Sequence, residues 1–347
     1  MGSTPSGAVP GWTALALAVL ALVLAACASP AALKPDRSTP IRAVTGATVE
    51  THPAVLSTAR TSRTARVRSA GGPRAWVAPK GWTITGYGLA IDGLHRSYLV
   101  ARPVDPGVAH LPVLVVLHGR EMTPRDMAAA SGFLGLVGPA VVVYPAGMAR
   151  SWNAGYCCGA AHAMGVDDVA FLEKVVAAVV GGVPGASAPR VYLVGYSNGG
   201  RMAYRMACTD PGAFAAVAAV EAVPVAPCGH VPAVPVAVVA STGDPLLTVP
   251  AGGSPKYIAG RAEPTVSAVV SQWRSIDGCA PAGSQERLGA VTLSEWSRCS
   301  GAARVEFAEY VGGSHHWPGG GPGTPSAESV IWSFFSAVGS TRPPAAR

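Results

Sequence analysis

Residues 190–200, with the sequence RVYLVGYSNGG, decide the fold. The first six are mostly hydrophobic and β-branched, which predicts a buried strand, and residues 198–207 have the apolar spacing of an amphipathic helix. In the turn between them, Gly195 and Gly199 flank Ser197 at two residues on either side. Such a turn can be very sharp, because a bulkier side chain at either glycine would clash. The stretch therefore predicts a strand–turn–helix unit that exposes the Ser197 hydroxyl at the carboxyl edge of a sheet.

Buried runs and helical patterns alternate on both sides of this unit. Strands are predicted at 83–91 and 96–101, around an Asp92-Gly93 turn, and at 113–117, 140–144, 234–240 and 304–310. Helices are predicted at 167–180, 265–276 and 326–338, the first of them capped by Asp167 and Asp168. This alternation predicts one α/β domain over residues 79–340: a mostly parallel, doubly wound sheet with an N-terminal antiparallel hairpin.

A serine in this position needs a base to take its proton and an acid to orient the base. His315 follows the last predicted strand on a glycine-rich loop and is the predicted base, with His316 as the alternative. Asp244 directly follows the predicted strand 234–240 and is the predicted acid. The chain order Ser197, Asp244, His315 is that of α/β-hydrolases.

Two backbone N–H groups are predicted to bind the oxyanion that forms when a serine attacks a carbonyl. The first belongs to Asn198, at the start of the predicted helix. The second belongs to Arg120, in the loop His118-Gly119-Arg120 after the strand 113–117. We interpret His118 as a structural loop residue, because one general base is enough.

Several further motifs occur in order: WNAGYCCG at 152–159, VDDVAFL at 166–172, GYSNGG at 195–200 and His315-x-Trp317-Pro318. This succession resembles the polyhydroxybutyrate depolymerase and feruloyl esterase family, including its actinobacterial lipoproteins. The resemblance spans about residues 92–317. It implies a secreted serine esterase of the α/β-hydrolase fold, with no cofactor, and assigns nucleophile, acid and base to Ser197, Asp244 and His315.

The sequence departs from that family at two points, which concern the position of the acid and the class of ester we expect as substrate. The family usually has His-Gly-Thr-x-Asp at the acid, whereas residues 240–244 read ASTGD, and relative to the family one residue is inserted before Val249-Pro250. No polymer-binding module follows in this sequence, so we expect soluble or cell-envelope esters. Trp152, Asn153 and Trp317 are candidates for the substrate pocket. The alternative for Trp152, equally weighted, is that it covers the core, and for Trp317 we favour packing within the loop that carries His315. The alternatives are a serine peptidase of the same fold and a degenerate hydrolase that only binds its ligand.

The N-terminal residues predict export. Residues 12–26 form an apolar run that is read as a signal-peptide core, although residues 1–11 hold no lysine or arginine. Leu24-Ala25-Ala26-Cys27 resembles a bacterial lipobox, so the signal peptide is predicted at 1–26 with Cys27 lipidated. Residues 27–78 are then a flexible basic tether and 341–347 a tail. The expected location is the outer face of the cell membrane, and the alternative is full secretion.

Six cysteines remain after Cys27, namely Cys157, Cys158, Cys208, Cys228, Cys279 and Cys299. An even number in an exported chain predicts three disulfides. We expect Cys279 to pair with Cys299, and Cys157 and Cys158 to join Cys208 and Cys228. A bond between the two adjacent cysteines is not expected, because a disulfide needs a specific geometry. No Cys-x2-Cys spacing or Cys/His cluster favours zinc, so no metal is predicted.

The formal net charge of the 347 residues is +7, which by itself would permit a nucleic-acid partner. Residues 28–74, however, hold eight basic side chains against two acidic ones, and Arg342 and Arg347 add two more. The remainder has a net charge of −1. We therefore expect no nucleic-acid partner. We expect a monomeric catalytic domain that takes an ester substrate, and a basic tether suited to an anionic membrane surface.

Overall fold

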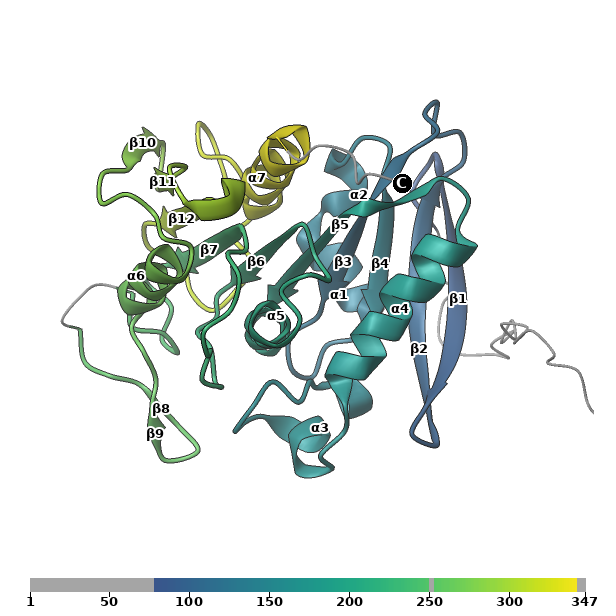
Figure 1. The fold of residues 1–347 in the computed structure, drawn as a ribbon, viewed down its shortest axis with the longest axis horizontal. Helices are drawn as coiled ribbons and strands as arrows, with labels where there is room; N and C mark the ends of the chain where they lie inside the picture. Colours follow the sequence, from purple (N-terminus) through teal and green to yellow (C-terminus); the bar gives the residue numbers. More distant parts are fainter. Residues whose placement is uncertain (1–77, 250–252, 342–347) are drawn as a thin grey trace, which may run out of the picture. The chain divides into compact units, whose positions relative to one another are not determined.

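The computed structural model describes residues 78–249 and 253–341, which form an α/β domain around one large sheet (Figure 1). In chain order the strands are β1 (Trp82–Ile91), β2 (Leu94–Pro103), β3 (Leu111–Leu117), β4 (Val141–Pro145), β5 (Ala186–Tyr196), β6 (Ala216–Val220), β7 (Val236–Ser241), β8 (Tyr257–Ile258), β9 (Arg261–Ala262), β10 (Ser284–Leu288), β11 (Val291–Trp296) and β12 (Val305–Tyr310). The helices are α1 (Pro124–Ser131), α2 (Phe133–Leu136), α3 (Gly159–Ala163), α4 (Asp168–Gly182), α5 (Asn198–Thr209), α6 (Val266–Ile276) and α7 (Ala327–Thr341).

The centre of the large sheet is parallel and its edges are antiparallel. The strand order is β1-β2-β4-β3-β5-β6-β7-β12-β11-β10. Neighbours from β4 to β12 run parallel, whereas β1 and β2 form a hairpin and β11 and β10 continue antiparallel beyond β12. The predicted fold class is thereby confirmed. Because parallel strands end at the same edge, the loops after β3, β5, β7 and β12 meet there.

Helices cover both faces of the sheet, so its central strands are buried on both sides. Helices α4, α5 and α6 pack on one face, and α1, α2 and α7 on the other (Figure 1). Along β3, Val113 and Val115 contribute to the first core, whereas Leu114 and Val116 contribute to the second. Burying each such side chain stabilises the fold by roughly 1.5–3 kcal/mol relative to its exposed state. This is why the strands read as continuous hydrophobic runs.

The predicted strands and helices are all present, with ends shifted by a few residues. Strand β6 was not predicted, because its sequence AVAAV is rich in alanine, which has little intrinsic preference for strands. It forms because β5 and β7 flank it, and all five of its residues are buried. Helix α1 was also missed, although Thr123 and Asp126 form a capping box that is visible in the sequence.

The disulfide predictions are right in one pair and wrong in the others. Cys279 bonds Cys299, as expected. Cys208, in the last turn of α5, bonds Cys228 in the loop after β6, with a Cα–Cα distance of 5.1 Å. Cys157 bonds its neighbour Cys158, contrary to the prediction. The peptide bond between these two is cis, which brings their Cα atoms to 3.1 Å, closer than a trans bond allows.

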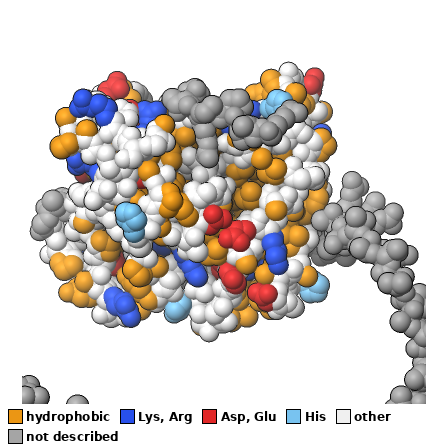
Figure 2. Space-filling view, viewed as in Figure 1, with side chains coloured by type: hydrophobic (Ala, Val, Ile, Leu, Met, Phe, Trp, Pro, Cys, Tyr) orange, Lys and Arg blue, Asp and Glu red, His pale blue; other side chains and the backbone are white. Residues whose placement is uncertain are grey.

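Several predictions concern residues outside the described part of the chain. They are the signal peptide at 1–26, the lipidation of Cys27, the tether up to residue 77 and the tail from residue 342. Within residues 78–249 and 253–341, no helix has both the length and the apolar character needed to cross a bilayer. Acidic and basic side chains are interspersed on the face that carries α4 and α5 (Figure 2). This mixed surface fits the nearly neutral charge counted from the sequence.

Candidate active site

The turn between β5 and α5 holds Ser197 in an unusual backbone conformation. Its φ and ψ are 53° and −117°, and its N–H donates to the Val220 carbonyl at 2.9 Å. A Cβ on Gly195 would lie 2.0 Å from the Gly199 carbonyl oxygen, and one on Gly199 would lie 2.6 Å from the His118 carbonyl oxygen. Only glycine fits at either position. The strained serine conformation is therefore maintained by the close packing of two strand ends and a helix.

The structure brings Ser197, His315 and Asp244 together from three separate loops. His315 Nε2 lies 2.8 Å from Ser197 Oγ, and His315 Nδ1 lies 2.6 Å from Asp244 Oδ2. The other histidine points elsewhere, since His316 Nδ1 lies 2.6 Å from Ser314 Oγ. These distances are those of a nucleophile, a base and an orienting acid. The arrangement favours His315 over His316 as the base.

Asp244 is positioned to remain ionised. Burial alone would raise its pKa, but hydrogen bonds from His315, Glu221 and the Leu246 N–H hold the pKa below its usual value. An ionised Asp244 accepts a hydrogen bond from His315 Nδ1–H, and the proton stays on the imidazole. That tautomer leaves Nε2 as the acceptor that faces the Ser197 hydroxyl.

The acid loop, which follows β7 and carries Asp244, is hydrogen-bonded to the histidine loop, which follows β12 and carries His315. The Thr242 N–H donates to the Tyr310 carbonyl and the Gly243 N–H to the Gly312 carbonyl, both at 2.8 Å, and Thr242 Oγ1 accepts from the Gly312 N–H. A Cβ on Gly243 would lie 2.4 Å from the Gly313 carbonyl oxygen, so the two loops need glycine at this contact. Residues 240–244 differ from the family's His-Gly-Thr-x-Asp pattern, but Asp244 still lies in contact with His315.

Two aromatic residues hold the histidine loop from beneath. The Tyr196 hydroxyl donates to the His315 carbonyl at 2.7 Å, and sequence reasoning did not identify this role. Trp317 donates from Nε1 to Glu328 Oε2 at 2.9 Å and packs edge-on against Tyr196 and Phe133. These contacts explain a structural role for Trp317. Its role in a substrate pocket stays a prediction.

Asn198 connects the start of α5 to the loop after β4. Its side chain accepts from the Trp152 N–H at 2.7 Å and donates to the Trp152 carbonyl at 3.1 Å. Its own N–H is one of the first in the helix, where no intrahelical acceptor exists, so it is free in principle to bind an oxyanion. Of the two roles left open for Trp152, the structure shows the core role. Its side chain is 0% exposed and packs against His118 and Phe171, because the loop folds back over the core.

The loop after β3 lies against the same helix. Buried His118 has Nδ1 2.7 Å from the Gly119 carbonyl, and Nε2 accepts the Gly147 N–H at 2.9 Å. Burial lowers its pKa to about 4, so it is a neutral structural residue, as interpreted. Arg120 follows it at the carboxyl edge with an exposed side chain. The role of the Arg120 N–H in the oxyanion site stays a prediction.

A buried ion pair fixes the loop that contains Asn153. Asp167 caps α4 as predicted, but Asp168 does not, because it lies fully buried 2.6 Å from the Arg96 guanidinium. The other Asp168 oxygen accepts the Asn153 N–H at 2.7 Å, and Asn153 Nδ2 donates to the Val166 carbonyl. Breaking such a pair typically costs about 3–5 kcal/mol. Asn153 is thus engaged in the loop, and its contact with substrate stays a prediction.

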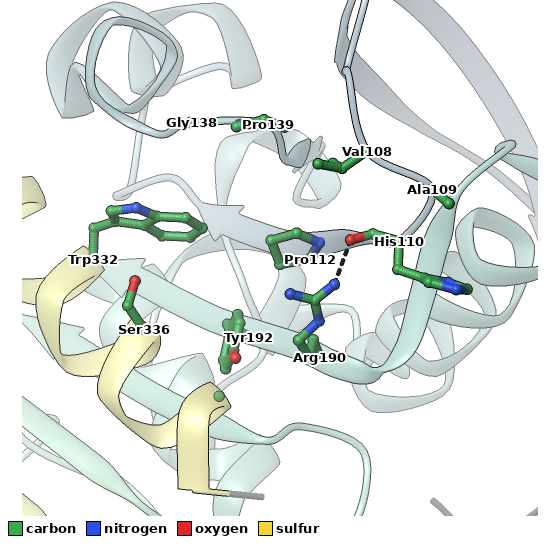
Figure 3. Close-up of a pocket in the computed structure, with 11 residues that line it drawn as sticks. Val108, Ala109, His110, Pro112, Gly138, Pro139, Arg190, Tyr192, Trp332 and Ser336 are labelled. Atoms are coloured by element: carbon green, nitrogen blue, oxygen red, sulfur yellow. Dashed lines mark hydrogen bonds between the residues drawn. The ribbon is translucent and has the colours of Figure 1, made fainter. Parts of the chain in front are cut away.

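A cavity of about 620 Å³ lies at the opposite edge of the sheet (Figure 3). Pro112 at the start of β3, Arg190 in β5 and Trp332 on α7 contribute to its lining, and Arg190 donates to the His110 carbonyl. Strand β3 has seven residues and separates this cavity from the loop that holds Arg120 by roughly 20 Å. The cavity is therefore not part of the serine site.

The fold and the site together define a class. A serine on a strand–turn–helix elbow, with an acid and a histidine from later loops of a doubly wound sheet, is the arrangement of the α/β-hydrolase fold. The chain has that fold.

Several known proteins are similar to the chain in sequence or in fold. The chain is 29% identical over 264 residues to the putative esterase NocK of Nocardia uniformis subsp. tsuyamanensis, covering 69% of this chain and 75% of that protein. It superposes on the acetyl xylan esterase of Aspergillus awamori with a TM-score of 0.52 at 12% identity, covering 73% and 99% of the two chains. A ferulic acid esterase of Anaeromyces mucronatus gives a TM-score of 0.47 at 14% identity, covering 78% and 95%. No protein-family model matches the chain.

Proposed function

We propose that this protein is a serine carboxylic-ester hydrolase that works through an acyl-enzyme. The observation that carries the proposal is the continuous set of contacts from Ser197 through His315 to Asp244, at 2.8 and 2.6 Å. The 29% identity to a putative esterase supports an ester as the substrate. No cofactor is needed for this chemistry, because the three side chains supply nucleophile, base and charge stabilisation.

The geometry supports a two-step reaction. Ser197 Oγ attacks the ester carbonyl carbon while His315 Nε2 takes its proton, and Asp244 stabilises the resulting imidazolium. The N–H groups of Asn198 and Arg120 bind the oxyanion of the tetrahedral intermediate. As the C–O bond breaks, His315 returns the proton to the leaving alcohol. Water then attacks the acyl-serine by the same route and releases the acid and Ser197.

Labelling by a fluorophosphonate probe tests the nucleophile. We expect the wild-type protein to react with one equivalent of probe, because the base activates Ser197, and Ser197→Ala to show no labelling. Ser333→Ala is the matched control, since Ser333 is exposed on α7 and should leave labelling unchanged. Intact-protein mass spectrometry measures the adduct. An unlabelled wild type, or equal labelling of Ser197→Ala, would rule out the proposal.

The reaction class is separated from its alternatives by substrate choice. An esterase cleaves p-nitrophenyl acyl esters much faster than peptide anilides, whereas a serine peptidase does the reverse. A degenerate binding protein cleaves neither and takes up no probe. Within the esters, we propose acetyl, feruloyl or short polyester substrates, in line with the family resemblance. Profiling acyl-chain length and hydroxycinnamoyl esters would identify the preferred one.

We further propose that the protein is exported and anchored through Cys27 to the outer face of the cell membrane. The lipobox-like Leu24-Ala25-Ala26-Cys27 and the basic residues of 28–74 support this location. Metabolic labelling with a lipid precursor should mark the wild-type protein and be lost in Cys27→Ala. The Cys27→Ala protein should then appear in the medium. Label that persists in Cys27→Ala would refute the anchor, and wild-type protein without label in the medium would indicate full secretion.

A further inference from the structure

Glu221 lies beside the serine site and was not predicted to have a role. It is the residue directly after β6, the strand between the strands that lead to Ser197 and Asp244. It has a φ of 47°, and its N–H donates to the Val239 carbonyl at 2.8 Å. Its side chain is 1% exposed, so a carboxyl group is held at the carboxyl edge of the sheet, away from water.

The Glu221 carboxyl group contacts Ser241, which immediately precedes the acid loop, and Asp244 within that loop. Ser241, the last residue of β7, lies against it through two atoms: Ser241 Oγ is 2.5 Å from Oε1, and the Ser241 N–H donates to Oε2 at 3.1 Å. The same carboxyl group makes a hydrogen bond with the side chain of Asp244. Glu221 thus connects the start of the loop to the acid that contacts His315.

Ionising both of two buried carboxyl groups in contact is strongly disfavoured, so at neutral pH one of them keeps a proton. Asp244 has two other donors, His315 Nδ1–H and the Leu246 N–H, and these favour its ionised form. Burial, and then the hydrogen bond to Asp244, raise the pKa of Glu221 to about 9. At neutral pH Glu221 is therefore the protonated partner, and its O–H donates to the Asp244 carboxylate.

We infer that Glu221 is a positioning residue. It holds the Asp244 carboxylate in the orientation that accepts the hydrogen bond from His315 Nδ1–H. This role rests on the proposed esterase function, and Glu221 acts through Asp244 without touching the substrate. A donor on the far side of Asp244 limits the rotation of its carboxylate, and the bond to Ser241 fixes the loop that carries it. Residues that orient the ligands of a metal site change activity by about 10- to 100-fold when they are mutated, and we expect an effect of the same order here.

The role predicts a pH dependence. As the pH rises through about 9, Glu221 loses its proton, the hydrogen bond to Asp244 is lost, and two like charges repel. The other titratable groups recorded around this carboxyl are Asp244, His315 beyond it, and Tyr196. Burial first, then Glu221 and Asp244, raise the pKa of Tyr196 to about 12, so Tyr196 stays neutral in this range.

Three variants test the inference. Glu221→Ala removes the donor and should lower kcat for an activated ester at pH 7 by about tenfold or more, with KM unchanged. Glu221→Gln keeps a donor that cannot titrate, so it should recover most of the lost kcat. The loss of activity near pH 9 that we expect in the wild type should be absent in Glu221→Gln. Glu306→Gln is the matched control, because Glu306 is another largely buried carboxyl with a raised pKa, on β12. This control variant should have the wild-type kcat and the same loss of activity near pH 9 as the wild type.

The outcomes are distinct. If Glu221→Ala is folded and has the wild-type kcat, Glu221 is not a positioning residue. The same follows if Glu221→Gln still loses activity near pH 9. If Glu221→Ala does not fold, the pH profile of Glu221→Gln decides alone. A wild type with no more esterase activity than Ser197→Ala overturns the proposed function instead.

The proton NMR signal of His315 Nδ1–H gives a readout that needs no substrate. It is assigned by its loss in His315→Ala. The signal should change near pH 9 in the wild type and persist in Glu221→Gln. An identical pH response in the two proteins would refute the inference, whatever the protein hydrolyses.

Discussion

The His315→Ala protein is expected to hydrolyse an activated ester with a kcat about a millionfold lower than the wild type, a loss of the size seen when the histidine of a Ser-His-Asp unit is removed. The reason is the position of His315 Nε2, 2.8 Å from Ser197 Oγ, where it is the only base that the structure places on the serine within the described residues. Without it the hydroxyl keeps its proton and is a weak nucleophile. Stopped-flow or long-time p-nitrophenyl ester assays measure the loss.

His316→Ala is the matched control for this prediction. His316 is adjacent in sequence but contacts Ser314, so its removal should change kcat by only a few-fold. Ser197→Ala with His315→Ala should be no worse than either single variant, because the two residues act as a unit. Comparable losses in His316→Ala and His315→Ala would contradict the assignment of the base. So would additive losses in the double variant.

The second large effect is expected for Asp244→Asn, which should lower kcat by about 10⁴-fold. The backbone geometry is retained, but an amide NH₂ in place of the charged oxygen now faces His315 Nδ1. The imidazole then takes the opposite tautomer, with its proton on Nε2 toward Ser197, where it cannot accept another. The KM should change little, because Asp244 is 5% exposed and its carboxylate contacts His315.

Asp126→Asn is the control for Asp244→Asn. Asp126 is exposed, and its contacts with Thr123 cap α1, so this variant should keep its activity within a few-fold. The pH profile adds a second check, because the residual activity of Asp244→Asn should rise at high pH, where hydroxide replaces the missing base. An Asp244→Asn protein with wild-type kcat would show that another carboxyl group serves the histidine.

Much of this site could be predicted because its signals are local. The elbow is indicated by Gly195, Ser197 and Gly199, which lie within five positions of one another; the clash at Gly195 arises within the turn itself, whereas the clash at Gly199 comes from the backbone of Leu117 and His118. Asp244 and His315 could be predicted because each directly follows a strand. Parallel strands that alternate with helices end at one edge of a sheet, so residues far apart in the sequence converge there.

The remaining features depend on contacts between distant segments. Asp168 was expected to be a cap, but Arg96 on β2 lies beside it in the core and makes it a buried ion pair. For Trp152 the sequence left a pocket role and a core role equally open, and contacts with the Asn198 side chain and the His118 carbonyl hold it in the core. Cys279–Cys299 was predicted, but the bonds Cys208–Cys228 and Cys157–Cys158 were not, because the path of the intervening loops is not visible in the sequence.

Local sequence patterns were enough to predict most of the strands and helices, the glycine elbow and the candidate nucleophile, acid and base. Those features follow from short-range sterics and from the hydrophobic period of each segment. Only the tertiary structure decided that Glu221 faces Asp244. Strand β6 forms because its neighbours bury it, and the protonation of a buried carboxyl depends on which charges and donors surround it in space. A titratable group acquires its function from its surroundings, and those surroundings exist only in the folded chain.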